Sequence, residues 1–478
     1  MPVHWLAFLG AACTAEKDES VQAIAFPRKN LFLADSPWPI SHNGPYSQGS
    51  SELPGLQSAD VEIEFLQVGL TSVTLIPTPM YEDGSRAIWG STPTEVYRIR
   101  LDDSMQIVDS VSSGSGLRDL VGGAYSLLDI DGRFYTVSGE TVHAFAESMP
   151  ESSNSMIEEL EKWSLIDPVE NEGLRGLGMT YDGVLIVVSS TGRVVALSRE
   201  LSWLSEVQLL GEVSNSIAID EDGGIYVVTS EAMHRLQWTG STLSTDPANG
   251  AWESTYENGS GETEPGRLGL GSGSTPSLMT VGEDKLVVIT DAQPLMHLVA
   301  FWRDKIPDNW LAPSGSDPRV AGVLPVTFGV PHVETSVSEQ SVLVMGDGAV
   351  VVNNDYGEMS GIEPVIAGLA PPGIELFRWD SQTNTLSSSW ALPDVSCPNG
   401  IPSASAATGL MYCVGKRDDT WTIEAIDWVT GTPKFHVPMG TENARYNSSY
   451  AATEIGPDGS ILTGTLTGIV RVFPNSAD

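Results

Sequence analysis

The sequence is poor in cysteine and in basic residues. It has 3 cysteines in 478 residues, which excludes a framework of disulfides as the basis of the fold. Its 24 lysine and arginine residues face 62 aspartate and glutamate residues, so the net charge is −38. No run of lysine and arginine exceeds two residues, and the chain therefore lacks a basic stripe for phosphate backbones or anionic head groups. We expect no nucleic-acid partner.

Long apolar runs are also scarce, because no segment approaches the roughly 20 apolar residues of a membrane helix. A short apolar run, residues 3–12, ends in small residues and is followed by Cys13 and a polar stretch. This arrangement resembles the end of a bacterial lipoprotein signal. The resemblance implies a signal at residues 1–13, a lipid anchor at Cys13 as the only membrane contact, and a tether at residues 14–34. The alternative is a buried N-terminal strand that happens to carry a cysteine.

Helical periodicity is almost absent, and residues 156–163 are the one stretch that predicts a short helix, on the surface between two repeats. The chain instead repeats short runs rich in Val, Ile, Tyr and Thr, separated by Asp-Gly or Gly-Asp turns. Such runs predict antiparallel strands joined by tight hairpins. The repeating units begin near residues 70, 122, 174, 214, 274, 339, 398 and 447.

A periodic array of three- or four-stranded units predicts an all-β fold, a single closed β-propeller. The eight units predict eight blades, with seven as the alternative. The last unit has only three strands before the chain ends, so we expect Val61 to Gln67 to supply its outer strand and close the ring. Closure removes an unpaired strand edge that would promote aggregation. Residues 35–69 are then an N-terminal segment with the closing strand, and residues 70–478 form the blades.

Several motifs resemble known propeller families. The segment WPISHNGPYSQG from Trp38 is similar to the opening of PQQ-like (quinoprotein-type) propellers, and blade sequences such as IAIDEDGGIYVVTS from Ile217 resemble PQQ-like and gluconolactonase-type repeats. Pro398-Asn399-Gly400-Ile401 is similar to a motif whose Asn binds calcium in the gluconolactonase family. Asn215-Ser216-Ile217-Ala218 is similar to a second such motif, with Ser in place of Asp. The resemblance implies Ca²⁺ as a cofactor, whereas the missing vicinal cysteine pair argues against PQQ.

The alignment of the units also predicts which side chains face the central funnel. Innermost strands lie beside the axis of a propeller, so a polar residue at the start of each unit points into the funnel. These residues are Arg175, Asn215, Thr275, Gln340 and Asn399, with Arg445 and Asn447 in the last unit.

Two interpretations of these residues stay open. In the first, Asn215 and Asn399, with Glu339 or Glu454, supply oxygen ligands to Ca²⁺, and His42 activates a water molecule. In the second, the polar side chains cap strand ends and bind ordered water.

We therefore predict an exported, monomeric propeller in the periplasm or at the surface of a bacterium. Its funnel would bind a small molecule or a protein, as a binding or scaffold module of the cell envelope. A calcium-dependent lactone or ester hydrolase in the funnel is the alternative, and a quinone-dependent oxidoreductase is the third. Cys397 and Cys413 could pair in an exported protein, or remain two buried thiols.

Overall fold

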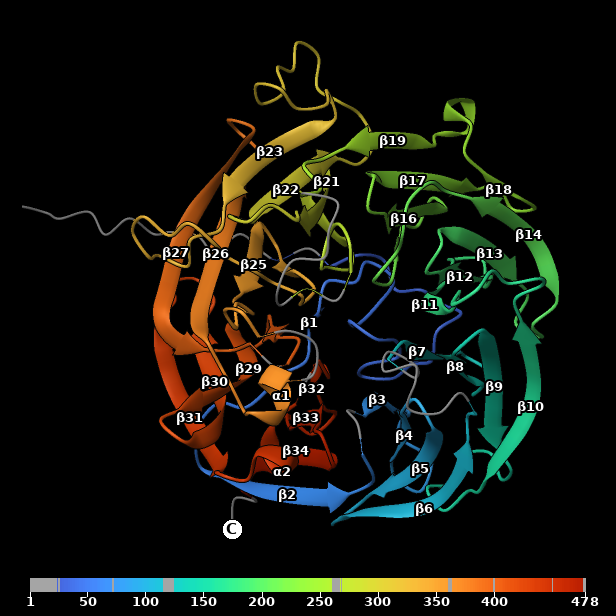
Figure 1. Ribbon diagram of the computed structural model, residues 1–478. Coiled ribbons are helices and arrows are strands. Elements are labelled where there is room, and N and C mark those ends of the chain that lie inside the picture. Colours follow the sequence, from blue (N-terminus) through green and yellow to red (C-terminus); the bar gives the residue numbers. More distant parts are fainter. Residues whose placement is uncertain are drawn as a thin grey trace, which may run out of the picture.

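The fold is a ring of eight antiparallel sheets around one axis (Figure 1). The computed structural model describes residues 24, 26–70, 73–114, 124–259, 267, 269–359, 363–398, 400–448 and 450–475. The prediction of an all-β, eight-bladed propeller is confirmed, and the seven-bladed alternative is wrong. The predicted signal and anchor, with Cys13, lie outside the described residues.

The first four blades follow one another along the chain. Blade 1 contains β3 (Thr74–Pro77), β4 (Ala87–Ser91), β5 (Glu95–Leu101) and β6 (Met105–Ser112), and blade 2 contains β7 (Ser126–Leu128), β8 (Phe134–Ser138), β9 (Thr141–Glu147) and β10 (Ile157–Ser164). Blade 3 contains β11 (Leu174–Met179), β12 (Leu185–Ser189), β13 (Arg193–Leu197) and β14 (Trp203–Gln208). Blade 4 contains β15 (Ala218–Ile219), β16 (Gly224–Val228), β17 (Ala232–Trp238), β18 (Leu243–Ser244) and β19 (Trp252–Thr255).

The last four blades include two strands from the N-terminal side of the chain. Blade 5 contains β20 (Ser277–Val281), β21 (Asp284–Thr290), β22 (His297–Trp302) and β23 (Val320–Pro325), and blade 6 contains β24 (Leu343–Met345), β25 (Gly348–Val352), β26 (Pro372–Asp380) and β27 (Thr385–Ser396). Blade 7 contains β28 (Ser403–Ser405), β29 (Leu410–Arg417), β30 (Thr420–Asp427) and β31 (Pro433–Gly440), with β1 (Ser50–Ser51) at its inner edge. Blade 8 contains β32 (Thr453–Ile455), β33 (Ile461–Gly464), β34 (Gly468–Pro474) and β2 (Val61–Gln67).

The ring closes through β2, which is the outer strand of blade 8. It pairs antiparallel with β34 along its whole length, from Val61 opposite Pro474 to Gln67 opposite Gly468. The blue and red ends of the chain therefore lie side by side in Figure 1. The predicted closing strand is confirmed with the predicted bounds.

The core lies in the layers between neighbouring blades. Second strands such as β8 and β12 are buried at every position, because each face of a blade packs on the next blade. This packing explains their continuous apolar runs. One buried cluster joins blades 2 and 3, for example through Tyr135, Val137, Leu177 and Leu185, and another joins blades 5 and 6.

The helix expected at residues 156–163 is wrong, because Ile157–Ser164 is β10, the exposed outer strand of blade 2. Its apolar residues happen to fall three or four positions apart, at Met156, Leu160 and Trp163, which imitates a helical period. Its charged residues face water, where charge on an outer strand prevents pairing with another molecule.

Among the described residues, the α-helices α1 (Glu363–Ile366) and α2 (Asn443–Tyr446) have one turn each, and a 3-10 turn spans Pro247–Asn249. No helix among these residues could span a bilayer. Cys397 and Cys413 form a disulfide with their Cα atoms 5.7 Å apart, and both residues are buried. Of the two alternatives left by the sequence, the pair is the one that the structure shows.

Candidate functional site

The axis of the ring is occupied at one end by the N-terminal segment. We call residues 30–56 the plug segment; it crosses the inner edges of the blades before β2 begins (Figure 1). Residues 45–51 of this segment are buried at every position. Gly49 has a φ of +70°, and a Cβ there would lie 3.2 Å from Leu343 Cδ1 and from Pro402 O, so only glycine fits without strain.

The plug segment is fixed by hydrogen bonds to the main chain of the inner strands. Five main-chain carbonyls of the segment accept hydrogen bonds from N–H groups of the blades. The pairs are Leu128 N–H to Pro39 O at 2.8 Å, Ile219 N–H to Pro45 O at 2.7 Å, Leu278 N–H to Tyr46 O at 2.9 Å, Val344 N–H to Gln48 O at 2.8 Å and Ala404 N–H to Gly49 O at 3.1 Å. These bonds reach blades 2, 4, 5, 6 and 7. Side chains add blades 1 and 3, because Ser36 Oγ donates to Pro77 O and Asn30 Nδ2 to Met179 O at 3.1 Å. The segment therefore satisfies inner-edge groups that would otherwise lack partners.

His42, the predicted catalytic base, lies inside this closed region. It is 3% exposed, its Nε2 is 3.5 Å from Ser341 Oγ, and its Nδ1 has no hydrogen-bond partner among the described residues. Burial lowers the pKa of His42 from 6.5 to about 4, so the imidazole is neutral at neutral pH. Its ring lies 5.9 Å from the ring of Tyr125, which the sequence analysis did not single out.

Tyr125 brings several of the predicted funnel residues together. The Thr275 side chain, the Ser216 main chain and the Arg175 guanidinium all lie close enough to its hydroxyl to lower the pKa of the phenol. Burial raises the pKa of this phenol. Ser216 N–H also donates to Thr275 Oγ1 at 3.2 Å. Tyr125 precedes the first strand of blade 2 and is not part of the repeated sequence pattern. Alignment of the repeating units therefore did not reveal it.

The remaining predicted funnel residues make hydrogen bonds within the protein, some of them to the neighbouring unit. Asn215 Nδ2 donates to Ser214 Oγ at 3.0 Å, and Gln340 Nε2 donates to Pro398 O at 3.1 Å. Thr275 and Gln340 are both buried. These contacts agree with either interpretation of the funnel residues, and both stay predictions.

The two predicted residues of the C-terminal unit contact β2 and the two short helices. The Arg445 guanidinium lies 4.5 Å over the ring of Phe65, on the outer strand β2. Asn447 is buried, and its Nδ2 donates to Val365 O at 3.2 Å and to Asn443 Oδ1 at 3.1 Å.

The two predicted acidic ligands are also separated. Glu454 is buried against Leu75 of blade 1, and burial raises the pKa of its carboxyl well above the usual range. Glu339 Oε1 is instead 3.5 Å from Arg267 Nη1. Asn399 lies outside the described residues. No group of three or more His, Cys, Asp or Glu that could hold a metal ion occurs in the described part of the chain, and the calcium site stays a prediction.

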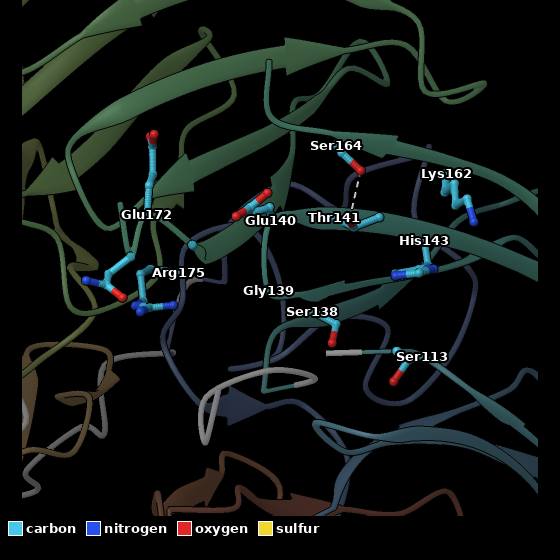
Figure 2. A pocket seen from close by; sticks show the side chains of 13 residues that line it. Ser113, Ser138, Gly139, Glu140, Thr141, His143, Lys162, Ser164, Glu172 and Arg175 are labelled. Atoms are coloured by element: carbon cyan, nitrogen blue, oxygen red, sulfur yellow. Dashed lines mark hydrogen bonds between the residues drawn. The ribbon is translucent and has the colours of Figure 1, made fainter. Parts of the chain in front are cut away.

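Arg175 is a predicted residue that lines a sizeable cavity of the described structure. This cavity has a volume of about 630 Å³ and lies between the end of β6, the β8–β9 hairpin, the end of β10 and the start of β11 (Figure 2). We call it the polar cavity. Its lining residues are Ser113, Gly114, Ser138, Gly139, Glu140, Thr141, His143, Lys162, Ser164, Asn171, Glu172, Gly173 and Arg175.

The β8–β9 hairpin positions the walls of the polar cavity. Gly139 O accepts from Leu174 N at 2.7 Å and Glu140 O from Leu165 N at 3.0 Å, so the hairpin tip is tied to the chain that enters blade 3. Thr141 Oγ1 and Ser164 Oγ are hydrogen-bonded at 2.8 Å, as Figure 2 shows. The hairpin therefore presents hydroxyl groups from a fixed backbone.

The charges around the polar cavity are unusual for so acidic a chain. Burial raises the pKa of Glu172, but hydrogen bonds from Ser189 and Thr191 outweigh it and leave the pKa below its usual value. The side chain of Glu172 also pairs with Arg193 Nη2 at 3.0 Å. The lining also contains two cations, Arg175, whose Nη1 donates to Leu174 O at 3.1 Å, and the exposed Lys162, together with the exposed acid Glu140.

Comparisons with known proteins agree with this architecture. No family model matches the chain. A europium-containing methanol dehydrogenase is similar in structure, with a TM-score of 0.53 and 12% identity, over 92% of this chain and 98% of the dehydrogenase. The C-terminal WD40 domain of Sif2 has a TM-score of 0.50 and 10% identity, over 88% of this chain and all of that domain. These likenesses confirm the β-propeller fold, and because one is an enzyme and the other a WD40 domain, they do not select an activity.

A relative in sequence is an uncharacterized protein from Archaeoglobus fulgidus. It is 38% identical over 469 residues, which cover 94% of this chain and 89% of that protein. Identity over almost the full length of both chains means that this chain belongs to the same protein family.

Proposed function

We propose that this family member is a binding module that holds a small hydroxylated carboxylate in the polar cavity between blades 1, 2 and 3. The main support for this proposal is that Arg175 and several hydroxyl side chains line the same cavity of about 630 Å³. That volume is within the range of about 300–1,000 Å³ for small-molecule sites. The chemical class covers sugar acids and hydroxy acids.

The lining supplies a partner for each group of such a ligand. A guanidinium is suited to a carboxylate, because its planar fork can donate two parallel hydrogen bonds. Serine and threonine hydroxyls both donate and accept, which suits ligand hydroxyl groups. Thr141 and Ser164 provide two of them, and Lys162 adds a second cation. The described lining contains no Phe, Tyr or Trp, which supports a polar ligand over an apolar one.

Calorimetric titration of the full-length protein with gluconate and galacturonate tests the proposal, with glucose as the uncharged counterpart. We expect the two acids to bind more tightly than glucose. Arg175→Gln is expected to weaken their binding by about 10-fold or more, because a hydrogen bond to a charged group contributes about 1.5–3 kcal/mol. The matched control is Lys305→Gln, which removes a positive charge from an exposed loop of blade 5.

Two results would contradict this assignment. The first is binding of the acids that is no tighter than that of glucose. The second is equal binding by Arg175→Gln and Lys305→Gln. Thermal unfolding of both variants shows that a loss of binding does not come from a loss of folding.

We further propose that the protein acts outside the reducing cytosol, as the lipoprotein-like N-terminus predicts. The disulfide between Cys397 and Cys413 supports this location, because disulfides persist in oxidising compartments. Because both cysteines are buried, cells are lysed directly into denaturant, and alkylation of the two cysteines is then expected only after a reductant is added. Alkylation without reductant would contradict the location.

A further inference from the structure

The opposite face of the same blades carries a second opening with a different chemistry. A groove of about 340 Å³ lies between the β3–β4 turn of blade 1 and the β7–β8 turn of blade 2. We call it the apolar groove. Buried Ala34 and Leu128 are part of its lining, and Met80 and Ile130 line it with side chains that are 61% and 51% exposed. Large apolar side chains exposed around a groove are typical of a docking surface.

The rim of the apolar groove is acidic. Asp35, Glu82, Asp131 and Glu151 line it as well. Asp35 and Asp131 pair with Lys29 and Arg199, whereas no ion pair joins Glu82 or Glu151 to another described residue. One base touches the groove, because Arg86 Nη2 lies 3.5 Å from Met80 Sδ. The lining therefore offers an apolar surface beside two carboxylates without basic partners.

We propose that the apolar groove docks a short segment of another protein in which apolar side chains are flanked by lysine or arginine. The apolar side chains would cover Met80 and Ile130, and the basic flanks would meet Glu82 and Glu151. Complementary charge favours such a partner over a second copy of this chain, because two molecules of net charge −38 repel each other. It also disfavours the chain's own residues 1–23, which contain one lysine and three acids.

The walls of the apolar groove are fixed before any partner arrives. Arg98 donates to Glu147 and to the Tyr81 hydroxyl, and Tyr81 also donates to Glu147, so blades 1 and 2 are joined beneath the groove. In the facing turn, Asp129 Oδ1 accepts from the N–H groups of Asp131 and Arg133 at 3.0 and 2.8 Å. A preformed groove binds a peptide without the entropic cost of ordering its own loops.

Selection of phage-displayed random decapeptides on the full-length protein tests the proposal. We expect enrichment of sequences with apolar residues between lysines or arginines. A synthetic peptide of the enriched sequence is expected to bind Ile130→Ser at least 10-fold more weakly than the parent protein. Leu210→Ser is the matched control, because Leu210 is 78% exposed in the connection between blades 3 and 4, away from the groove.

The charge contribution is tested separately with the double variant Glu82→Gln, Glu151→Gln. We expect it to weaken binding of the same peptide and to reduce the dependence of its affinity on salt. Gluconate at saturation is expected to leave peptide binding unchanged, because the polar cavity lies on the other face. The docking proposal can therefore fail while the carboxylate proposal stands, or the reverse.

Several outcomes would overturn the docking proposal. They are a selection that enriches no sequence, enrichment of acidic peptides, and equal binding by Ile130→Ser and Leu210→Ser. A dimer in light scattering that Ile130→Ser converts to a monomer would instead assign the groove to a second copy of this chain.

Discussion

The axis of this propeller and the seam between blades 1 and 2 are built in opposite ways. At the axis, the plug segment joins the inner strands of five blades through main-chain hydrogen bonds, and His42 is buried within it. At the seam, the polar cavity opens on one face and the apolar groove on the other. At the axis, therefore, main-chain pairing covers the inner strand edges, whereas the contacts between blades 1 and 2 leave a cavity on each face.

The difference follows from where hydrogen-bonding groups and turns are placed. Inner strands have one free edge along the axis, and the plug segment pairs with that edge. At the seam the strands end in turns of unequal length, because residues 78–86 connect β3 to β4 whereas residues 129–133 connect β7 to β8. The β3–β4 turn is longer than the neighbouring β7–β8 turn, and the part of the longer turn that extends beyond the shorter one forms a wall of the apolar groove.

The largest expected effect is a loss of stability when the packing of the plug segment is weakened. Trp38 of the plug segment is 1% exposed and belongs to the same buried cluster as Leu56 and Ile455 of blade 8. We expect Trp38→Ala to lower the free energy of unfolding by about 3–5 kcal/mol, because it leaves a large cavity. Denaturant unfolding followed by tryptophan fluorescence measures the loss.

Trp38→Phe is the control for this substitution. It keeps most of the ring volume and removes an indole N–H that has no partner among the described residues, so we expect a much smaller loss than with alanine. Equal stability of Trp38→Ala and the parent protein would show that the plug segment is not part of the cooperative structure, and the contrast between axis and seam would fail.

The ring was predictable from the sequence, whereas its binding surfaces were not. The Asp-Gly turns repeat along the chain, and the missing fourth strand of the last unit identified Val61–Gln67 as the closing strand. Thr275 lies two residues before β20, the innermost strand of blade 5, and its role in the funnel stays a prediction. The sequence gives no sign, however, that Tyr125 lies against Thr275 or that the plug segment occupies the axis.

The site could not be predicted because it depends on contacts between blades that have no periodic signature. The polar cavity requires the end of β6, the β8–β9 hairpin and the start of β11 to meet, and each contributes ordinary serines, threonines and glycines. β10 was missed for a related reason, because an exposed outer strand with three glutamates and one lysine among its eight residues has no clear alternation.

A smaller effect is expected at the seam between blades 6 and 7, which a disulfide closes. Cys397 lies on the connection from β27 to β28, and Cys413 lies on β29. Replacing both by alanine removes a cross-link between residues 16 apart. Closing a loop of this length stabilises the folded state by about 3 kcal/mol, through the lower entropy of the unfolded chain. We expect a lower unfolding midpoint in denaturant and unchanged gluconate binding by the polar cavity.

Unchanged gluconate binding would show that the seam between blades 6 and 7 can lose its disulfide without any effect on the polar cavity at the seam between blades 1 and 2. A double variant that loses gluconate binding while still folded would show that the two seams are coupled. Reduction of the parent protein with dithiothreitol in denaturant is expected to reproduce the lower midpoint, and it serves as a check that the substitution itself does not disturb packing.

The smallest of the three expected effects is on the pH dependence of the unfolding free energy, and it tests whether water reaches His42 at the axis. Burial holds the pKa of His42 at about 4, whereas an unfolded chain protonates it near 6.5. Between these values the unfolded state binds more protons, so stability is complete above pH 6.5 and falls as the pH drops toward 4. The loss reaches about 2 kcal/mol at pH 5, since each pKa unit corresponds to about 1.4 kcal/mol. His42→Gln is expected to flatten this part of the profile of unfolding free energy against pH, measured from pH 8 to pH 5. Identical slopes for the variant and the parent protein would mean that the imidazole is solvated, and that the axis is open like the seam.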